Sequence, residues 1–266
     1  MDGKISLSIY QHFRKHEHPF VDQVLSWKQQ VEQRHKLYLT DFLDPREQQI
    51  VSSLIGAKHD DIHFSLHGGI ELAERKRAII APFYEQINEQ LFEVILLGAT
   101  YPSKFMTLSH RDILGACMSL GIDRKKLGDI YVDHDEFHLI VTKDIVPFLK
   151  MHLTKINQAT IKLDEKSFRV QLKNKDVWEK STHIVSSLRL DILVKEIYRI
   201  SRKQAVTLIK ENRVKVNFTE VDEPAMQVIE NDLLSVRGFG RSKVIEINGK
   251  TRKNKIIITS AKLKTR

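Results

Sequence analysis

Residues 188–217 read LRLDILVKEIYRISRKQAVTLIKENRVKVN, and this stretch decides how the last third of the chain folds. Ser201 and Gln204 have the spacing of a capping box, so we predict a helix over about residues 202–212. The alternation of apolar and polar residues that follows, at 214–217, predicts a strand that begins a small sheet.

The predicted helix has two unlike sides. At about 100° per residue, its apolar residues fall on one arc and its basic residues on another. The apolar arc holds Ala205, Leu208 and Ile209, and the basic arc holds Arg202, Lys203 and Lys210. The unpaired backbone N–H groups at the start of such a helix favour phosphate. The pattern therefore predicts one side that packs and one that meets an anion.

Basic charge is concentrated near the end of the chain. The 266 residues contain 43 Lys and Arg against 34 Asp and Glu, a net charge of +9. Residues 237–266 hold ten of these basic residues and one acid, Glu246, and residues 199–215 form a second basic run. Each phosphate that a protein neutralises releases counterions, so this distribution indicates a polyanion such as nucleic acid. The alternative is a solvated basic surface.

The first two thirds of the chain predict two further domains. We expect residues 1–84 to be mainly helical, with helical sequence over 5–56 and a capping box at Asp44 and Glu47. We expect residues 85–172 to follow the ferredoxin-like order β-α-β-β-α-β. Its strands and helices are predicted at 91–97, 109–121, 129–132, 137–141, 144–153 and 158–163.

The remaining boundaries complete an α+β architecture of three domains. The polar residues 173–182 are predicted to be a linker, and 183–266 a small domain with a basic C-terminal tail. A second strand is expected at 232–236, followed by a flexible basic loop at 237–241.

The C-terminal stretch resembles the α-L RNA-binding motif, which ribosomal protein S-four shares with some pseudouridine synthases and tyrosyl-tRNA synthetases. The residues that carry the resemblance are Arg189, Leu190, Asp191, Leu193, Ser201, Arg202, Ala205, Leu208, Ile209, Val214, Val216, Asn217 and Asp232. One position departs, because Phe218 stands where the motif usually has glycine. The resemblance implies that the start of the second helix and the following strand grip RNA.

The predicted RNA-binding residues come from this resemblance and from the basic runs around it. They are Arg189, Ser201, Arg202, Lys203, Lys210, Arg213, Lys215, Arg237 and Arg241. Two further basic clusters, 75–77 and 124–126, are weaker candidates for RNA contact, since such clusters are more often solvated surface.

Segments along nearly the whole chain resemble the YlmH family of bacterial proteins. They are residues 10–13, 39–47, 68–69, 73–78 and 120–130, together with 237–241. The resemblance implies a cytoplasmic, ribosome-associated protein that acts in rescue or quality control of stalled translation. It implies ribosomal RNA of the large subunit and tRNA as partners.

The same sequence predicts binding without catalysis. Cys117 is the only cysteine, no glycine-rich nucleotide loop is present, and no histidine cluster has the spacing of a metal site, so no cofactor and no metal are expected. No apolar run is long enough for a membrane span, and a monomer is expected when the protein is free.

Two other classes of function stay open at this point. An RNA-modifying enzyme could use the same module for targeting, but the middle of about 100 residues is short for a pseudouridine synthase and lacks a methyltransferase's cofactor loop. An adaptor of the cell-division machinery would leave the basic C-terminus without a role.

Overall fold

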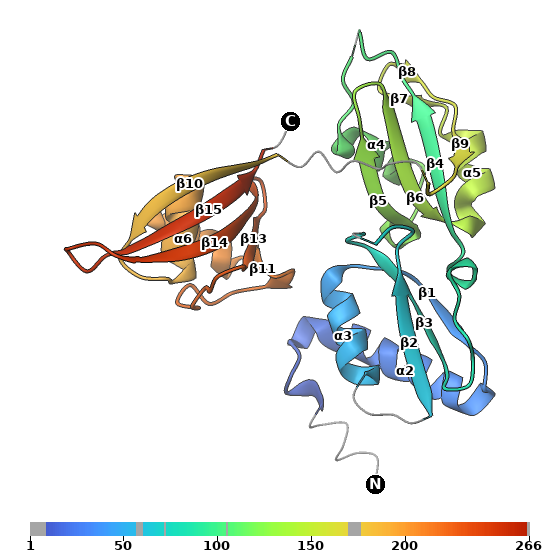
Figure 1. Cartoon of the computed structure of the whole chain (residues 1–266), viewed down its shortest axis with the longest axis horizontal. Coiled ribbons are helices and arrows are strands. Elements are labelled where there is room, and N and C mark those ends of the chain that lie inside the picture. The colour runs from blue at the N-terminus through green and yellow to red at the C-terminus, as the bar shows by residue number, and fades with distance from the viewer. Residues whose placement is uncertain (1–8, 57–60, 72, 105, 170–176, 265–266) are drawn as a thin grey trace. The chain divides into compact units, whose positions relative to one another are not determined.

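The chain folds into two compact units, Met1–Asn174 and Lys175–Arg266 (Figure 1). This computed structural model describes residues 9–56, 61–71, 73–104, 106–169 and 177–264. Both units mix helices with antiparallel sheets, so the α+β class is confirmed. No helix in those residues has both the length and the apolar character of a bilayer span. The predicted division of the first unit near residue 84 stays a prediction.

The N-terminal half of the first unit packs two helices on one face of a three-stranded sheet of order β1-β3-β2. Its elements are η1 (Lys15–Glu17), α2 (His18–Arg34), β1 (Tyr38–Leu43), α3 (Pro45–Ile55), β2 (Ile62–His67) and β3 (Lys76–Pro82). The capping box that begins α3 is confirmed, because Asp44 accepts from the Glu47 N–H and Glu47 accepts from the Asp44 N–H.

The expectation of helix throughout 5–56 is wrong at β1, and residues 5–8 lie outside the described part of the chain. β1 is short and irregular, since its register against β3 shifts between Leu39 and Phe42. That bulge breaks the alternation that would have marked a strand in the sequence.

The middle of the chain forms the predicted split β-α-β motif. Its elements are η2 (Glu89–Phe92), β4 (Val94–Thr100), α4 (His110–Ser119), η3 (Arg124–Lys126), β5 (Leu127–Val132), β6 (Glu136–Thr142), η4 (Lys143–Ile145), α5 (Val146–His152), β7 (Lys155–Ile156), β8 (Ala159–Thr160) and β9 (Asp164–Lys166). The sheet order β5-β6-β4-β9 places the last strand beside the first, and α4 and α5 cover one face. We predict the last strand at 158–163, but the strand that pairs with β4 is β9, at 164–166. Ile161 and Leu163 are instead buried in the core between the sheet and its helices.

Hydrogen bonds join the two halves of this unit. The carboxylate of Asp129 in β5 accepts from the backbone N–H groups of Glu74 and Arg75 at 2.7 and 3.2 Å. The Arg75 guanidinium donates to the carbonyls of Leu127 and Phe42 at 3.1 and 3.0 Å. The Phe42 side chain packs with residues on the second face of the middle sheet. Both faces of that sheet are therefore partly covered by protein.

The second unit packs two helices on a six-stranded sheet of order β10-β15-β14-β13-β11-β12. Its elements are β10 (Trp178–Val185), α6 (Leu190–Tyr198), α7 (Arg202–Lys210), β11 (Val214–Val216), β12 (Thr219–Glu220), β13 (Leu233–Val236), β14 (Gly240–Lys250) and β15 (Ile256–Leu263). All strand pairs are antiparallel.

Two predictions about loops in this unit are wrong, and the predicted basic C-terminal tail includes a strand. Residues 178–182 of the predicted linker belong to β10, and 173–176 lie outside the described residues. Most of the predicted basic tail is β15, which pairs with both β10 and β14. Of the predicted flexible loop at 237–241, residues 237–239 form a hairpin turn between β13 and β14, with Gly238 at φ 87°, and residues 240–241 belong to β14. In β10 only the last residue is buried, so backbone hydrogen bonds to β15 rather than apolar burial hold this strand, and no hydrophobic period marks it.

The departure from the α-L motif at Phe218 lies in a strained turn. Val216 pairs with Thr219, so Asn217 and Phe218 form a two-residue hairpin loop, and their φ angles are 48° and 67°. Left-handed φ at both positions defines a turn that favours Asn-Gly. Asn217 also donates to Asp232 at 2.7 Å and accepts from the Leu233 N–H at 2.9 Å. The motif residues Asn217 and Asp232 are thus structural partners.

We expect Asn217→Ala to destabilise the second unit by about 2 kcal/mol, because it removes two hydrogen bonds and places alanine at positive φ. Urea unfolding of the full chain, followed by a probe in this unit, measures the effect. Phe218→Gly is the matched control, since the relieved backbone strain offsets the lost contact with Arg241, whose guanidinium lies 5.7 Å from the ring. Equal losses for both variants would contradict this account of the turn.

Candidate nucleic-acid interface

The predicted cap at the start of α7 is confirmed in its first bond, from the backbone N–H of Gln204 to Ser201. Ser201 is the N-cap, and its hydroxyl accepts from the Gln204 N–H at 3.1 Å. Ala205, Leu208 and Ile209 are buried in the core of the second unit, which leaves the basic side of the helix in solvent. The helix ends at Lys210, two residues before the expected end.

A buried carboxylate organises the two arginines. Asp191 lies in the first turn of α6, and its side chain is 1% exposed. Arg189 donates to its two oxygens at 3.0 and 3.3 Å, and the Nε of Arg202 donates to Oδ2 at 3.0 Å. Burial acts to raise the pKa of Asp191, but the bonds from Arg189 and Arg202 prevail and lower that pKa. Asp191 therefore stays charged and joins α6 to α7.

The arginines remain available to a ligand. Their side chains are 37% exposed for Arg189 and 59% for Arg202. A guanidinium has five N–H donors, so each keeps donors after bonding to Asp191. Because the Asp191 carboxylate fixes the guanidinium planes of Arg189 and Arg202, these side chains lose little rotamer entropy when an anion binds.

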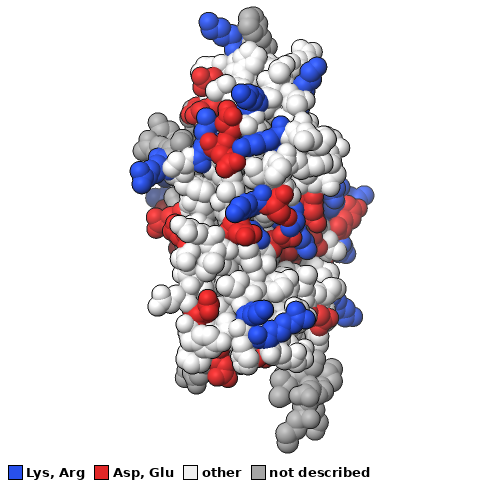
Figure 2. All heavy atoms as spheres, turned by 90° about the vertical axis from the view of Figure 1, so that its right-hand side faces the viewer, with Lys and Arg blue, Asp and Glu red and all other residues white. Residues whose placement is uncertain are grey.

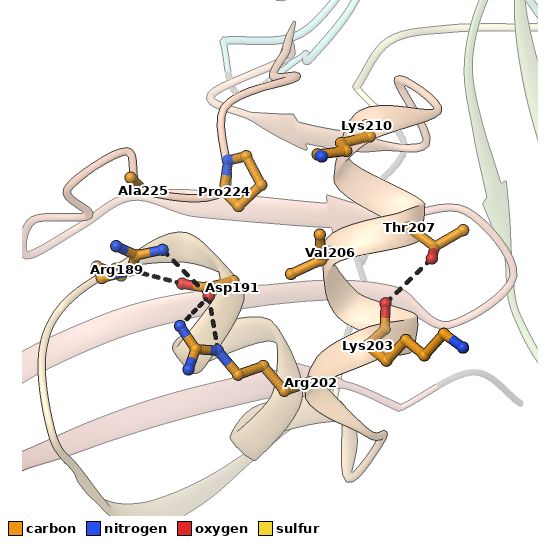
Figure 3. Close-up of a pocket in the computed structure, with 9 residues that line it drawn as sticks. All are labelled: Arg189, Asp191, Arg202, Lys203, Val206, Thr207, Lys210, Pro224 and Ala225. Atoms are coloured by element: carbon orange, nitrogen blue, oxygen red, sulfur yellow. Dashed lines mark hydrogen bonds and ion pairs between the residues drawn. The ribbon is translucent and has the colours of Figure 1, made fainter.

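An open groove of about 620 Å³ runs along this surface. Its lining includes Arg189, Asp191, Arg202, Lys203, Val206, Thr207, Lys210, Pro224 and Ala225. Figure 3 shows Arg189 and Arg202 converging on Asp191, with Lys210 farther along α7 toward Pro224. The opposite wall is held in place because the N–H of Asp191 donates to the Pro224 carbonyl at 3.1 Å. The groove thus carries four cations against one carboxylate.

The other predicted site residues lie outside the groove. Ser201 caps α7, Arg213 lies 3.5 Å from Glu211, and Lys215 lies 3.7 Å from Glu220. Arg237 is exposed in the hairpin turn, and its N–H donates to the Arg213 carbonyl at 2.9 Å.

Arg241 belongs to a row that crosses the sheet. Lys215 pairs with Ser235, and Ser235 pairs with Arg241, while the flanking residues Val214 and Val236 are buried. Side chains alternate along a strand, so this row faces away from the helices. The nine predicted residues are therefore divided between a groove and the surfaces around it.

Sequence reasoning missed the orienting role of Asp191. A signal was present, because Asp191 falls among the core positions of α6, where Leu190, Leu193 and Val194 are buried. A carboxylate at a core position requires a cation or several donors.

Most residues of the two basic clusters in the first unit are engaged in its own structure, whereas Lys125 is exposed. Arg75 bonds to backbone carbonyls, and Arg77 is buried. Arg124 donates to the Leu127 carbonyl at 2.6 Å, and Lys126 pairs with Asp41 and Asp144 at 2.8 and 2.9 Å. Figure 2 shows basic and acidic side chains interspersed on the face that it draws. These contacts favour a structural role for both clusters.

The middle sheet also lacks an open platform for bases. Domains of this topology bind RNA by stacking bases on exposed aromatics of the central strands. Here Leu96 of β4, Ile140 of β6 and Tyr131 of β5 form a buried cluster with Phe42. The sheet face that would stack bases is thus partly covered, with Phe42 of the N-terminal half in that cluster.

The fold of the second unit and its cationic groove define an RNA-binding protein with an S4-type domain. Comparison with family models agrees, since "S4 domain" matches residues 188–234, "Putative RNA-binding domain in YlmH" matches 88–170, and "YlmH, N-terminal" matches 16–85. The chain belongs to the YlmH family.

Two known proteins support this assignment. "Ribosome-associated protein quality control protein P2" of Bacillus subtilis (strain 168) is 41% identical over 255 residues, which cover 94% of this chain and 97% of that protein. The solved structure "Cell division protein ylmH from Streptococcus pneumoniae" is 30% identical with a TM-score of 0.54, and covers 62% of this chain and 99% of that one.

Proposed function

We propose that this protein binds the large ribosomal subunit while it still carries tRNA, and acts in quality control of stalled translation without catalysing a reaction. The groove between α6, α7 and Pro224 is the observation that carries the proposal. The groove has four cationic side chains, two of them oriented by Asp191. This arrangement suits an RNA backbone with its regularly spaced phosphates.

The geometry favours recognition of RNA shape over sequence. Guanidiniums held by Asp191 present planar donors, which match phosphate oxygens in pairs. Lys203 and Lys210 are exposed on the same helix and extend the contact along it. Structured RNA is read mainly through its backbone and 2′-hydroxyls, so such a surface suits a duplex or a tRNA junction.

The name of the Bacillus subtilis relative supports a ribosomal partner and a role in quality control. Ribosome binding would place the protein in the cytoplasm, and we propose a monomer when it is free. The name of the Streptococcus pneumoniae structure refers to cell division. We favour RNA over a division partner because the groove is cationic.

Charge reversal in the groove provides the test. Lys203 and Lys210 form no ion pair with any described residue, so Lys203→Glu with Lys210→Glu leaves the Asp191 network intact. We expect this variant to bind large subunits at least about 10-fold more weakly at 0.1 M salt, with the slope of log K against log salt reduced by about 2. Sedimentation with large subunits through sucrose gradients at several salt concentrations measures both values.

The matched control is Lys104→Glu with Lys162→Glu, which makes the same change in net charge on exposed residues of the first unit. We expect it to sediment nearly as wild type does. If both variants bind large subunits as tightly as the wild type does, the groove is not the RNA contact. If the control loses binding as fully as the groove variant, net charge alone explains the affinity.

A further inference from the structure

Strands β14 and β15 form a long hairpin that ends in a strongly basic turn. Residues 250–255, which we call the basic tip, contain four exposed cations and no acid. The cations are Lys250, Arg252, Lys253 and Lys255. Strand β13 pairs with β14 only as far as Lys243, so the tip lies about 20 Å farther along β14. Figure 1 shows this hairpin projecting at the left of the second unit.

The backbone of the turn is fixed by its own hydrogen bonds. The Thr251 N–H donates to the Lys255 carbonyl at 2.7 Å, and the Asn254 N–H donates to the Thr251 carbonyl at 2.9 Å. The Thr251 hydroxyl accepts from the Lys255 N–H at 3.2 Å. Asn254 has a left-handed φ of 57°, which asparagine tolerates in turns. The cations are therefore attached to an ordered turn, which lowers the entropy lost when a partner binds.

The basic tip differs from other parts of the second unit in the balance of its charge. Elsewhere in the unit, Lys215 lies 3.7 Å from Glu220 and Lys264 lies 2.9 Å from Glu179. No cation of the basic tip forms an ion pair with an acid in the described part of the chain. The nearest acid along the chain, Glu246, precedes the tip by four residues. Four like charges on one turn repel one another in the free protein, so the tip favours an anionic partner.

The basic tip is separate from the groove. None of its four cations is among the described residues that line the groove, which come from the start of α6, from α7 and from residues 224–225. The match to the S4 family model also ends at residue 234, before β14 begins. The likeness to S4 domains therefore does not account for the tip.

We propose that the basic tip binds the phosphate backbone of a second RNA segment, distinct from the segment that the groove holds. This inference rests on the proposed function for the identity of the RNA and adds a second place where the protein contacts it. Lysine and arginine neutralise phosphates whatever the base sequence, so the tip adds affinity and salt dependence rather than sequence preference. Two contacts on one compact unit also fix its orientation on the RNA.

Directed cleavage of RNA locates the two contacts. Cys117 is the only cysteine and is buried, so a cysteine introduced on the surface is the one that reacts. An iron–EDTA reagent that generates hydroxyl radicals is attached at Lys253→Cys in the full chain, or at Thr207→Cys in the groove, and each protein is mixed with large subunits that carry tRNA. We expect the tip probe to cleave RNA at positions that the groove probe leaves intact. RNA that is cut by the groove probe alone overturns the inference, and so does a cleavage pattern that both probes share.

Affinity separates this inference from the proposed function. Arg252→Glu with Lys253→Glu should weaken binding to large subunits about 10-fold and reduce the slope of log K against log salt by about 2. The matched control is again Lys104→Glu with Lys162→Glu, which makes the same change in net charge. If the tip variant binds as this control does while the groove variant loses binding, the inference fails and the proposed function stands. If only the tip variant loses binding, the inference stands and the groove is not the RNA contact. If wild type itself fails to bind, both fail.

Discussion

Replacing Arg189 and Arg202 together by alanine is expected to unfold the second unit more easily and to abolish most RNA binding. The change leaves Asp191 buried with no cation beside it. A buried charge that loses its partners costs about 3 kcal/mol, which lowers the melting temperature of a unit this size by about 10 °C or more. If these two guanidiniums bind phosphate as we propose, their loss should weaken RNA binding about 100-fold. Thermal unfolding and subunit sedimentation measure the two effects.

A third substitution separates stability from binding. Adding Asp191→Asn to the double variant removes the buried charge, so we expect much of the stability to return while RNA binding stays lost. If the triple variant is no more stable than the double variant, the carboxylate is not the source of the instability.

The pH dependence gives an independent signature of this ion-pair cluster. In the wild type the bonds from Arg189 and Arg202 outweigh burial and lower the pKa of Asp191, so its contribution to stability is present above about pH 4 and is lost as the pH falls through the lowered pKa. In the double variant burial alone remains and should raise that pKa. Stability is then lost as the pH rises through the raised value. The difference in unfolding free energy should therefore be largest near pH 7 and shrink below about pH 4.

The second large effect is expected at Arg77, in the first unit. Its side chain is buried and donates to the carbonyls of Thr40 and Phe92 at 2.7 Å and of Glu93 at 3.2 Å. Burial lowers the pKa of this guanidinium. Arg77→Leu removes the guanidinium donors from these buried carbonyls, which should cost about 3 to 5 kcal/mol and lower the melting temperature of the first unit by about 10 °C.

Arg77→Lys is the graded control. It keeps one charged donor group and should lose less stability than Arg77→Leu. Binding to isolated RNA should survive Arg77→Leu at temperatures where the first unit stays folded, because the groove belongs to the second unit. A melting temperature unchanged by Arg77→Leu would contradict the structural role given to this residue.

The sequence predicted the groove better than its surroundings, for physical reasons. Helix α7 has both a cap at Ser201 and a two-sided distribution of residues, and each is a local signal that survives without tertiary information. Arg189 was placed only through the resemblance to the α-L motif. Its position in the groove depends on Asp191, which lies two residues further along the chain. The contact of Asp191 with Arg202 joins α6 to α7, and no local period reveals it.

Features held by backbone pairing were harder to predict. Strand β10 is polar over residues 179–183, and all but its last residue are solvent-accessible, so no apolar period marks it. Arg75, Arg77 and Arg124 looked like surface charge, yet they donate to carbonyls of other segments. Whether an arginine faces solvent or a carbonyl is decided by tertiary packing, which composition does not record.

Binding to large subunits with and without tRNA tests the central claim most directly. Purified large subunits of each kind are mixed with the full chain and sedimented through sucrose at several salt concentrations, with the Lys203→Glu, Lys210→Glu variant in parallel. We predict that the wild type sediments with both, more strongly when tRNA is present, and that salt and the variant each release it. Wild-type protein that stays at the top of the gradient at low salt, or a variant that sediments as wild type does, would contradict the account.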